Sequence, residues 1–587
     1  MCGIIGYVGQ EQASKILTRG LKRLEYRGYD SCGIAVLKNP DIHVLKGIGS
    51  VGKVCEEKRF ENVEGNIGIS HTRWATHGGV TDENTHPHTS CSGDIAIVHN
   101  GIIENFVELK KELKNHVFKS ETDSEVIAHL IEEFYDGDFV QAVFKTALKL
   151  KGSFAFIAMH VKEKMLVACR KESPLVTGIG ENEFFIASDT LSFSNKTRNV
   201  VFMSDGEAVV VKNGGAVFYD FFSGKEIKKN VSKVADGSYD VSKGGMDHFL
   251  IKEIHEQPDT LKLSLMQDKS KLIEVARMIN SAPRVCIIAC GTSRHAAIVG
   301  RYIISEVTGK YCEVYMASEF QYFVDKIGKD TLIIAVSQSG ETADVLGPVR
   351  IAKHAGCKLI SIVNVVGSSL DLLSDISVYL NAGPEISVAS TKAFSSQLMI
   401  FYQIAYTMTY NLDEKLVELR GLVDKIREVI ANNEEKTKLL AKKIKDENDI
   451  YYIARAINFA VASEGALKIK EISYIHAEGM PAGELKHGTL ALITDGTPVI
   501  AIAPYDYTYS ETINNIHEVK ARGGFVIGIT DHSNGVFDFE LLIPKVDPLY
   551  YPILANIPCQ LLAYYTAVEK GCNVDKPRNL AKSVTVK

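Results

Sequence analysis

The stretch that decides the fold of most of this chain is RVCIIACGTSRHAAIVGRYII, residues 284–304, together with DTLIIAVSQSGETADVLGPVRIAKHAG, residues 330–356. Each segment begins with an apolar run of strand length, passes through a turn of small and hydroxyl-bearing residues, and ends in a stretch of helical periodicity. The same order returns in DIYYIARAINFAVASEGALKIKE, residues 449–471, and in TPVIAIAPYDYTYSETINNIHEVKARGG, residues 497–524. This repetition predicts two doubly wound α/β domains in tandem.

The residues before the repeat follow a different pattern. They contain many short runs with strand character and two helical stretches, around residues 106–113 and 124–134, which predict layered α and β structure. A segment rich in Lys, Ser, Gly and Asp then separates this part from the repeat. We therefore divide the chain into an N-terminal domain (1–222), a linker (223–246), a first α/β domain (247–420), a second α/β domain (421–570) and a C-terminal tail (571–587).

Length and composition exclude several classes of protein. With 587 residues the chain is too long for one hydrophobic core. The net charge of -6 gives no basic footprint, so we expect no nucleic-acid partner, and no apolar run reaches the length of a membrane span. The 11 cysteines are odd in number and lack C-x-x-C spacing, which is typical of a reducing compartment. We predict a cytoplasmic protein without a membrane partner.

The chain opens MCGIIGYVG, with a thiol at position 2. Because the cysteine side chain is small, we expect Met1 to be removed, which leaves Cys2 with a free α-amino group. An α-amino group titrates at about pH 8 and can serve as general base for the thiol of its own residue. Position alone leaves open the alternative that Cys2 is an ordinary buried cysteine at the start of an edge strand.

The first α/β copy contains two turns suited to an anion. AVSQSGET places Ser337, Gln338, Ser339 and Thr342 between a buried strand and a helix, where backbone N–H groups and the helix dipole favour a phosphate. The turn ACGTSRH adds further hydroxyls in the same copy, and the second copy has no such turn. The alternative is that these hydroxyls only cap helices. Two such turns in one copy favour a single monophosphate site.

The second copy carries charges on one face of an otherwise apolar helix. Glu464, Lys468 and Glu471 stand at i, i+4 and i+7, and this spacing suits either acid–base work at a pocket wall or a solvated salt-bridged face. The apolar surroundings favour the pocket wall. His487, in GELKHG, suits a structural cap as well as proton transfer.

The N-terminal domain contains a polar cluster. Five of its histidines lack the spacing of a zinc site, so we expect no metal there; they are His71, His77, His86, His88 and His99. Arg73 and Asp123 suit the α-carboxylate and the ammonium group of a free amino acid. The Asn100 side-chain amide and the Gly101 backbone N–H could form an oxyanion hole.

Two sets of motifs carry a resemblance to a known family. The first resembles the glutaminase domain of the N-terminal-nucleophile (Ntn) amidotransferases and consists of CGIIG, LEYRGYDS, HTRWATHG, HPH, VHNGIIEN and SETDSEV. The second resembles the two sugar-isomerase (SIS) domains of the glutamine:fructose-6-phosphate aminotransferases and consists of CGTS, SQSGETAD, EISVASTKAF, GALKIKEISYIHAEG, GELKHG and PRNLAKSVTV. One local departure is Thr489, where many members have proline. The resemblance implies an α+β Ntn glutaminase domain with αββα layers, followed by two α/β SIS domains.

For the glutaminase half, the resemblance implies that Cys2 attacks the side-chain amide of L-glutamine and that Asn100 and Gly101 stabilise the oxyanion. It assigns glutamine binding to Arg73, Trp74, Thr76, His77 and Asp123. Trp74 is also implied to gate a channel that carries ammonia between the domains.

For the sugar half, the resemblance implies that Lys582 forms a Schiff base with fructose 6-phosphate, that Glu471 moves a proton between C1 and C2, and that His487 opens the sugar ring. It places the following residues around the sugar phosphate: Thr292, Ser293, Ser337, Gln338, Ser339, Thr342, Val388, Ala389, Glu464, Lys468 and Ala581. In the family the histidine comes from the neighbouring subunit, which implies a homodimer, and neither half needs a metal or an organic cofactor.

Two other functions stay open at this point. One is a sugar-phosphate isomerase or deglycase with an attached glutaminase. The other is a sensor of sugar phosphates without catalysis, which should lack Glu471, His487 and Lys582, yet all three are present.

Overall fold

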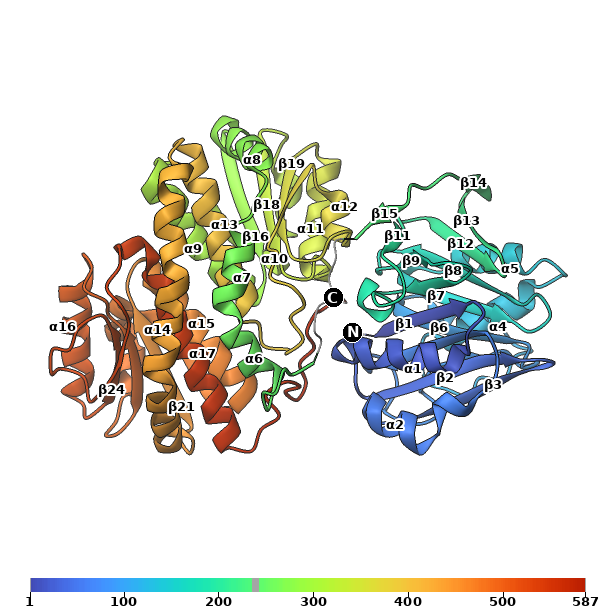
Figure 1. Cartoon of the computed structure of the whole chain (residues 1–587), viewed down its shortest axis with the longest axis horizontal. Helices are drawn as coiled ribbons and strands as arrows, with labels where there is room; N and C mark the ends of the chain where they lie inside the picture. Colours follow the sequence, from blue (N-terminus) through green and yellow to red (C-terminus); the bar gives the residue numbers. More distant parts are fainter. Residues whose placement is uncertain (1, 235–241, 586–587) are drawn as a thin grey trace.

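The computed structural model describes residues 2–234 and 242–585. The expected removal of Met1 therefore concerns a residue outside the described ones. Figure 1 shows the N-terminal domain on one side of the molecule and the two α/β domains on the other, with both chain ends near the boundary between them.

The N-terminal domain contains two stacked antiparallel sheets. The described strands of the first are ordered β15-β11-β9-β10-β1-β4-β2-β3, and those of the second β14-β13-β12-β8-β7-β6-β5. The bounds in the first are β15 Ser232–Lys233, β11 Asn199–Phe202, β9 Val176–Ile179, β10 Phe184–Ala187, β1 Gly3–Val8, β4 Ile67–Arg73, β2 Ser31–Lys38 and β3 Asp41–Ile48. Those in the second are β14 Lys225–Ile227, β13 Gly215–Asp220, β12 Glu207–Lys212, β8 Met165–Lys171, β7 Gly152–His160, β6 Ile95–Ile103 and β5 His88–Thr89.

Helices cover the outer face of each sheet. Helices α1 (Ala13–Leu24) and α2 (Val51–Glu57) share an apolar cluster with the first sheet, whereas α4 (Glu125–Phe134) and α5 (Phe139–Lys149) share one with the second. The short helix α3 (Phe106–Glu112) precedes α4. A third cluster, which includes Ile4 and Ile157, fills the space between the sheets. The layers are therefore αββα, as the resemblance implied.

Each α/β domain contains a parallel five-stranded sheet with the strand order 2-1-3-4-5. The orders are β17-β16-β18-β19-β20 and β22-β21-β23-β24-β25. The first set is β16 Arg284–Ala289, β17 Glu313–Met316, β18 Thr331–Ser337, β19 Lys358–Val363 and β20 Ile376–Tyr379. The second is β21 Asp449–Ala454, β22 His476–Pro481, β23 Pro498–Ile502, β24 Phe525–Thr530 and β25 Phe539–Leu542. The predicted tandem of doubly wound domains is confirmed.

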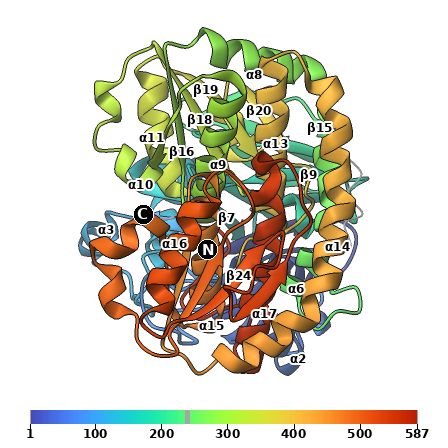
Figure 2. The same cartoon turned by 90° about the vertical axis from the view of Figure 1, so that its left-hand side faces the viewer.

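The helices of the two α/β domains pack together. The first domain has α6 Phe249–His255, α7 Gln257–Ser264, α8 Lys269–Ser281, α9 Gly291–Thr308, α10 Ala317–Phe320, α11 Ala343–His354, α12 Ser369–Leu373 and α13 Lys392–Met408. The long helix α14 (Leu412–Ile444) then leads to the second domain, which has α15 Ile457–Ser473, α16 Tyr509–Lys520 and α17 Tyr551–Glu569. One apolar cluster includes residues of α9, α13, α14, α15 and α17, so the two domains share a core. Figure 2 shows α14 extending beside both sheets.

The linker and the tail both contact the N-terminal domain. Within the linker range, β14 pairs with β13 and β15 pairs with β11, while residues 235–241 lie outside the described part. In the tail, the backbone oxygens of Pro577 and Leu580 accept hydrogen bonds from the Tyr29 hydroxyl at 3.3 and 3.0 Å. Among the described residues, no helix combines the length and the apolar composition needed to span a lipid bilayer.

Candidate active sites

Cys2 directly precedes β1 and lies beside the end of β4. Its Sγ lies 3.4 Å from the backbone nitrogen of Trp74 and 3.5 Å from the Trp74 carbonyl oxygen, because β1 and β4 pair with Gly3 opposite Thr72. Burial raises the pKa of the Cys2 thiol, and the Trp74 N–H and the Arg73 guanidinium only partly offset this. The thiol therefore needs a base to become a nucleophile.

Arg73 ends β4 and organises the loop that follows. Its guanidinium donates hydrogen bonds to the backbone oxygens of His77 (2.6 Å), Gly78 (3.2 Å) and Gly79 (2.9 Å). The loop is thus wrapped around the charged group that was predicted to bind a carboxylate. Within it, Thr76 is exposed and His77 is half-buried.

Asn100 and Gly101 lie on β6. Asn100 is 3 % exposed, yet both its side-chain amide atoms lack a hydrogen-bond partner among the described residues. Gly101 has φ +130°, and a Cβ there would collide with the Ser153 carbonyl, so glycine is required. A buried amide with free hydrogen-bonding capacity suits a site that receives a ligand.

Asp123 lies just before α4, and its carboxylate is buried. The Asp123 Oδ2 accepts the backbone N–H of Ile103 at 2.7 Å, and Oδ1 accepts the Ser124 hydroxyl at 3.3 Å. The Ile103 bond joins the Asp123 carboxylate to β6, the strand that carries Asn100.

Trp74 contacts Cys2 through its backbone and Tyr29 through its ring. Its ring meets the edge of the Tyr29 ring at 5.4 Å, and Tyr29 in turn donates to the backbone of the tail near Lys582. A continuous set of contacts therefore runs from the residue beside Cys2 to the tail.

The hydroxyl-bearing turns of the first α/β domain lie where predicted. They follow β16 and β18, which are neighbours in the sheet, at the point where the strand order reverses. Ligands of open α/β sheets bind at this position. The Ser337 hydroxyl accepts the Gly340 N–H and pairs with the Thr342 hydroxyl, both at 3.1 Å, while Ser339 accepts the Glu341 N–H at 3.2 Å.

Charged side chains join the two α/β domains. From α9, the Thr292 hydroxyl and the His295 ring donate to the Glu464 carboxylate of α15 at 2.9 and 2.7 Å. Lys468 is ion-paired with Glu464 at 3.4 Å and with Glu471 at 2.7 Å. Glu464 is fully buried and Lys468 is 2 % exposed, so this part of the helix face is buried and is not a solvated salt-bridged surface.

The pKa values of the Glu464 and Glu471 carboxylates are shifted in opposite directions. Burial alone would raise the pKa of Glu464, but Lys468 and His295 outweigh it and lower the pKa below its usual range. For Glu471 burial dominates and raises the pKa, although Lys468 opposes the shift. Burial also acts on Lys468, but its two carboxylate partners raise the pKa of the ammonium group above its usual value.

Lys582 has a buried partner that sequence reasoning missed. Its ammonium group is 2.5 Å from the Glu385 carboxylate, and the two side chains are 3 % and 0 % exposed. Glu253 lies in the same group; burial and Glu385 raise the pKa of Glu253 to about 8, while Lys582 lowers the pKa of Glu385 to about 2 against the effect of burial. Glu385 belongs to the motif EISVASTKAF, but nothing in the sequence pairs it with a lysine 197 positions away.

The remaining predicted residues are placed as follows. The Ser293 hydroxyl accepts from Gln397 at 2.9 Å, and the Val388 N–H donates to the Asp575 carbonyl at 3.1 Å. Ala389 is buried, and Ala581 precedes Lys582 in the tail. His487 is exposed at the end of the 3₁₀ helix η5 (Ala482–His487) and forms no hydrogen bond or ion pair within the described part of the chain.

A cavity of about 430 Å³ lies between the first α/β domain and the N-terminal domain. Gln338 and Lys582 line it on one side, and Arg27 lines it on the other. The Arg27 Nε donates to the Cys2 carbonyl at 3.3 Å. The cavity is therefore bordered by the turn after β18 and by an arginine that contacts the backbone of Cys2.

These features define a glutamine amidotransferase domain joined to a pair of sugar-phosphate domains. The model of the glutamine amidotransferase domain family matches residues 71–195, and that of the SIS domain matches residues 278–406 and 443–570. The chain is 46% identical to glutamine–fructose-6-phosphate aminotransferase (isomerizing) of Caldanaerobacter subterraneus and 45% identical to that of Thermococcus kodakarensis, over 100% of both chains in each case.

A solved structure agrees with these relatives. It is the C-terminal domain of glucosamine-fructose-6-phosphate aminotransferase from Francisella tularensis, which covers 57% of this chain and 100% of its own, with 34% identity and a TM-score of 0.52. The chain belongs to the family of glutamine–fructose-6-phosphate aminotransferases (isomerizing).

Proposed function

We propose that this chain uses L-glutamine to convert fructose 6-phosphate to glucosamine 6-phosphate and glutamate, as a homodimer in the cytoplasm. The observation that carries the proposal is the cavity with Lys582 on one side and Arg27, the hydrogen-bond partner of the Cys2 carbonyl, on the other. Free ammonia is mostly protonated in water, so an enclosed path between a source and a sugar carbonyl preserves its reactivity.

In the glutaminase half, the α-amine of Cys2 takes the proton of the thiol, whose raised pKa makes such a base necessary. The sulfur adds to the side-chain carbonyl of glutamine, and the Asn100 amide and the Gly101 N–H stabilise the oxyanion. Ammonia leaves, and water hydrolyses the thioester to glutamate and the free thiol. Arg73, Asp123, Thr76 and His77 hold the two charged ends of the substrate.

In the sugar half, the phosphate is bound by the turns after β16 and β18. The Lys582 amine condenses with the C2 carbonyl and releases water, and ammonia then displaces the lysine from C2. Glu471 removes the proton from C1 and returns it to C2, while the proton of the C1 hydroxyl passes to the nitrogen. The C2 imine thereby becomes an amine and C1 becomes an aldehyde. The raised pKa of Glu471 suits a group that both accepts and donates a proton.

His487 opens the ring of the bound sugar from the neighbouring subunit. Its exposure and its lack of polar partners among the described residues support a role at another chain's site. This arrangement is the reason for proposing a dimer.

The decisive experiment supplies glutamine labelled with ¹⁵N at the side-chain amide together with fructose 6-phosphate. We expect the label in glucosamine 6-phosphate, together with unlabelled glutamate. Labelled ammonia without labelled sugar, beside glucose 6-phosphate, would instead indicate an isomerase with an attached glutaminase.

The variant Cys2→Ala separates the two halves. We expect it to abolish glutamine-dependent synthesis and to retain slow conversion of fructose 6-phosphate to glucose 6-phosphate, because the nucleophile and the sugar site lie in different domains. Both products are measured by chromatography of the same reaction. Normal glutamine-dependent output from this variant would show that Cys2 is not the nucleophile.

A further inference from the structure

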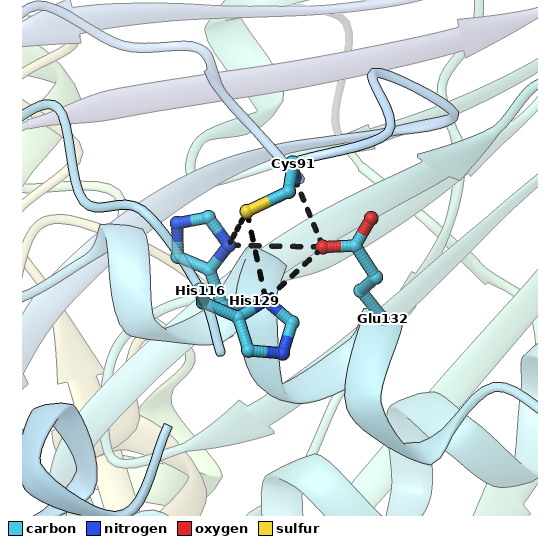
Figure 3. Close-up of side chains that lie close together, drawn as sticks. All are labelled: Cys91, His116, His129 and Glu132. Carbon is cyan, nitrogen blue, oxygen red and sulfur yellow. Dashed lines mark hydrogen bonds and ion pairs between the residues drawn. The ribbon is translucent and has the colours of Figure 1, made fainter. Parts of the chain in front are cut away.

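Four side chains with metal-binding atoms meet on the N-terminal domain, away from both candidate sites. Cys91 lies in the loop between β5 and β6, His116 lies between α3 and α4, and His129 and Glu132 lie on α4. The Sγ, the two ring nitrogens and a carboxylate oxygen all lie within 4.8 Å of one another. Figure 3 shows the four side chains directed toward a common centre.

The separations of these atoms fit a tetrahedral ion. The Cys91 Sγ is 3.7 Å from the His116 Nδ1 and 3.6 Å from the His129 Nδ1. The Glu132 Oε2 is 3.2 and 3.8 Å from the same two nitrogens. Around zinc, with bonds of about 2.3 Å to sulfur and about 2.0–2.2 Å to nitrogen or oxygen, neighbouring ligand atoms stand roughly 3.3–3.6 Å apart.

A carboxylate lies near the outer ring nitrogen, Nε2, of each histidine. The His116 Nε2 lies 3.0 Å from the Glu133 carboxylate, and the His129 Nε2 lies 3.5 Å from the Glu125 carboxylate. Histidines that bind a metal through one ring nitrogen commonly donate the other N–H to a carboxylate, which fixes the tautomer. This leaves the His116 Nδ1 as an acceptor that faces the cysteine and Glu132. The His129 Nε2 lies near the Glu125 carboxylate but forms no hydrogen bond among the described residues.

The Cys91 sulfur accepts a backbone hydrogen bond, which would stabilise a thiolate. The backbone N–H of Val117 donates to the Cys91 Sγ at 3.3 Å. The carboxylate of Glu132 is oriented by the N–H groups of Cys91 and Ser92 at 2.9 and 2.8 Å. His129 is 1 % exposed and the side chain of His116 is 8 % exposed, so the histidines are largely withdrawn from water.

We propose that Cys91, His116, His129 and Glu132 bind one Zn²⁺ ion per chain as a structural site. Four protein ligands of sulfur, nitrogen and oxygen complete a tetrahedron and leave no open position for catalysis. The site differs from the five histidines considered in the sequence analysis, whose spacing excluded a metal. Here the ligands come from three segments, and the two histidines follow the cysteine by 25 and 38 positions, so no metal-binding motif of closely spaced residues marks them.

The ion would stabilise the segment that carries Asp123. His116 and His129 flank that residue in the sequence, and the ion joins both to the loop before β6. The carboxylate behind His129 is Glu125, which also accepts the N–H groups of Lys119 and Ser120 at 2.8 and 2.7 Å. Loss of the metal would therefore loosen the residues just before Asp123 without touching Cys2.

The test measures metal on the purified full-length chain. We expect inductively coupled plasma mass spectrometry to find one zinc per chain in the unmodified protein and in Cys572→Ser, a control that removes a thiol elsewhere. Cys91→Ser should lose the zinc. Equal zinc in the unmodified protein and in Cys91→Ser would overturn the proposal, because the ion would then be bound elsewhere.

Cobalt provides a second measurement that does not depend on the metal present during purification. After chelation of the full-length protein, added Co²⁺ should give the visible bands of a tetrahedral ion and a thiolate-to-cobalt charge-transfer band, and Cys91→Ser should lose the latter. No such spectrum at saturating Co²⁺ would overturn the proposal and leave the four residues as a hydrogen-bonded cluster.

A conservative variant guards against a general loss of folding. Glu133→Gln keeps all four ligands but removes the carboxylate behind His116, and we expect it to bind Co²⁺ roughly 10- to 100-fold more weakly. Glu64→Gln, on an exposed side chain outside the cluster, is the matched control and should bind normally. Unchanged affinity in Glu133→Gln would contradict the proposed geometry.

Discussion

The two α/β domains have the same strand order but opposite chemistry at the equivalent turns. In the first domain, the turns after β16 and β18 present hydroxyls and backbone N–H groups. In the second, the turn after β21 presents Arg455, which is paired with Glu511 at 2.7 Å, and the turn after β23 presents the Asp506 carboxylate near Asn458 at 3.1 Å. The Asp506 carboxylate disfavours a phosphate at the turn after β23, which supports the prediction of a single phosphate site in the first domain.

The second domain contributes charge in another way. Its helix α15 carries the buried ion pairs that meet α9 of the first domain. The cavity toward the N-terminal domain, by contrast, is lined by the first domain and the tail. We therefore predict that the first domain supplies phosphate binding and the second supplies acid–base groups.

Removal of the buried lysine should have the largest effect. Lys468→Met leaves Glu464 and Glu471 without their shared cation, and breaking a buried pair costs about 3–5 kcal/mol. The free energy of unfolding in urea measures the loss. The double variant Lys468→Met with Glu464→Gln should recover part of the stability, because the uncompensated charge is gone. Unchanged stability of the single variant would show that α15 does not depend on the ion pairs.

Loss of Glu471 should stop the sugar chemistry alone. Glu471→Gln removes the proposed base, which is worth roughly 100- to 10,000-fold in rate, while glutaminase activity persists. Because burial raises the pKa of Glu471, the unmodified enzyme should lose its isomerase rate as the pH falls through a value above the usual glutamate range. The pH–rate profile of the conversion of fructose 6-phosphate to glucose 6-phosphate measures this. An acid limb at or below the usual glutamate range would contradict the assignment.

Truncation of the phosphate turn should weaken binding without affecting glutaminase chemistry. Ser339→Ala combined with Thr342→Ala removes hydrogen bonds to a charged group worth about 1.5–3 kcal/mol each, so the Kd for fructose 6-phosphate should rise at least roughly tenfold. Thr508→Ala in the equivalent turn of the second domain is the control and should leave the Kd unchanged. Calorimetry with fructose 6-phosphate measures the Kd of each variant. An equal rise in Kd from the Thr508 substitution would contradict the prediction that only the first domain binds the phosphate.

The smallest expected effect concerns Trp74 of the N-terminal domain and the proposed passage of ammonia. Trp74→Ala should retain folding and glutamine hydrolysis but yield more glutamate than glucosamine 6-phosphate, because ammonia escapes where the ring closed its path. The ratio of the two products at saturating substrates measures the leak. Tyr29→Phe, which keeps the ring beside Trp74 and removes the hydroxyl bonded to the tail, should give a smaller imbalance. A ratio of one to one in Trp74→Ala would exclude the gate.

Sequence patterns predicted the structural features that depend on residues close together in the chain. The repeated strand–turn–helix unit fixed the parallel sheets, since an apolar run followed by an amphipathic helix has few other ways to bury its surface. The spacing of Glu464, Lys468 and Glu471 placed them on one face, and α15 confirms it. The assignments of catalytic and binding roles stay predictions.

Contacts between distant segments escaped sequence reasoning. Glu253 on α6 and Glu385 before α13 become partners of a tail lysine only after three segments pack together. The cluster around Cys91 also joins separate segments, and the i, i+3 pair of His129 and Glu132 is its only local sign. Neither group has a periodicity that a single sequence displays.

The apolar core shared by the two α/β domains limits how this chain can be divided. Each α/β domain has one apolar cluster of its own, but α14, α15 and α17 bury residues against helices of the first domain in a shared cluster, so neither copy buries all of its apolar surface alone. The N-terminal domain, in contrast, has separate clusters within and around its two sheets. We therefore expect two independent folding units and not three: a cut near the linker should give two fragments that each fold, whereas a cut within α14 should leave both pieces with exposed apolar surface.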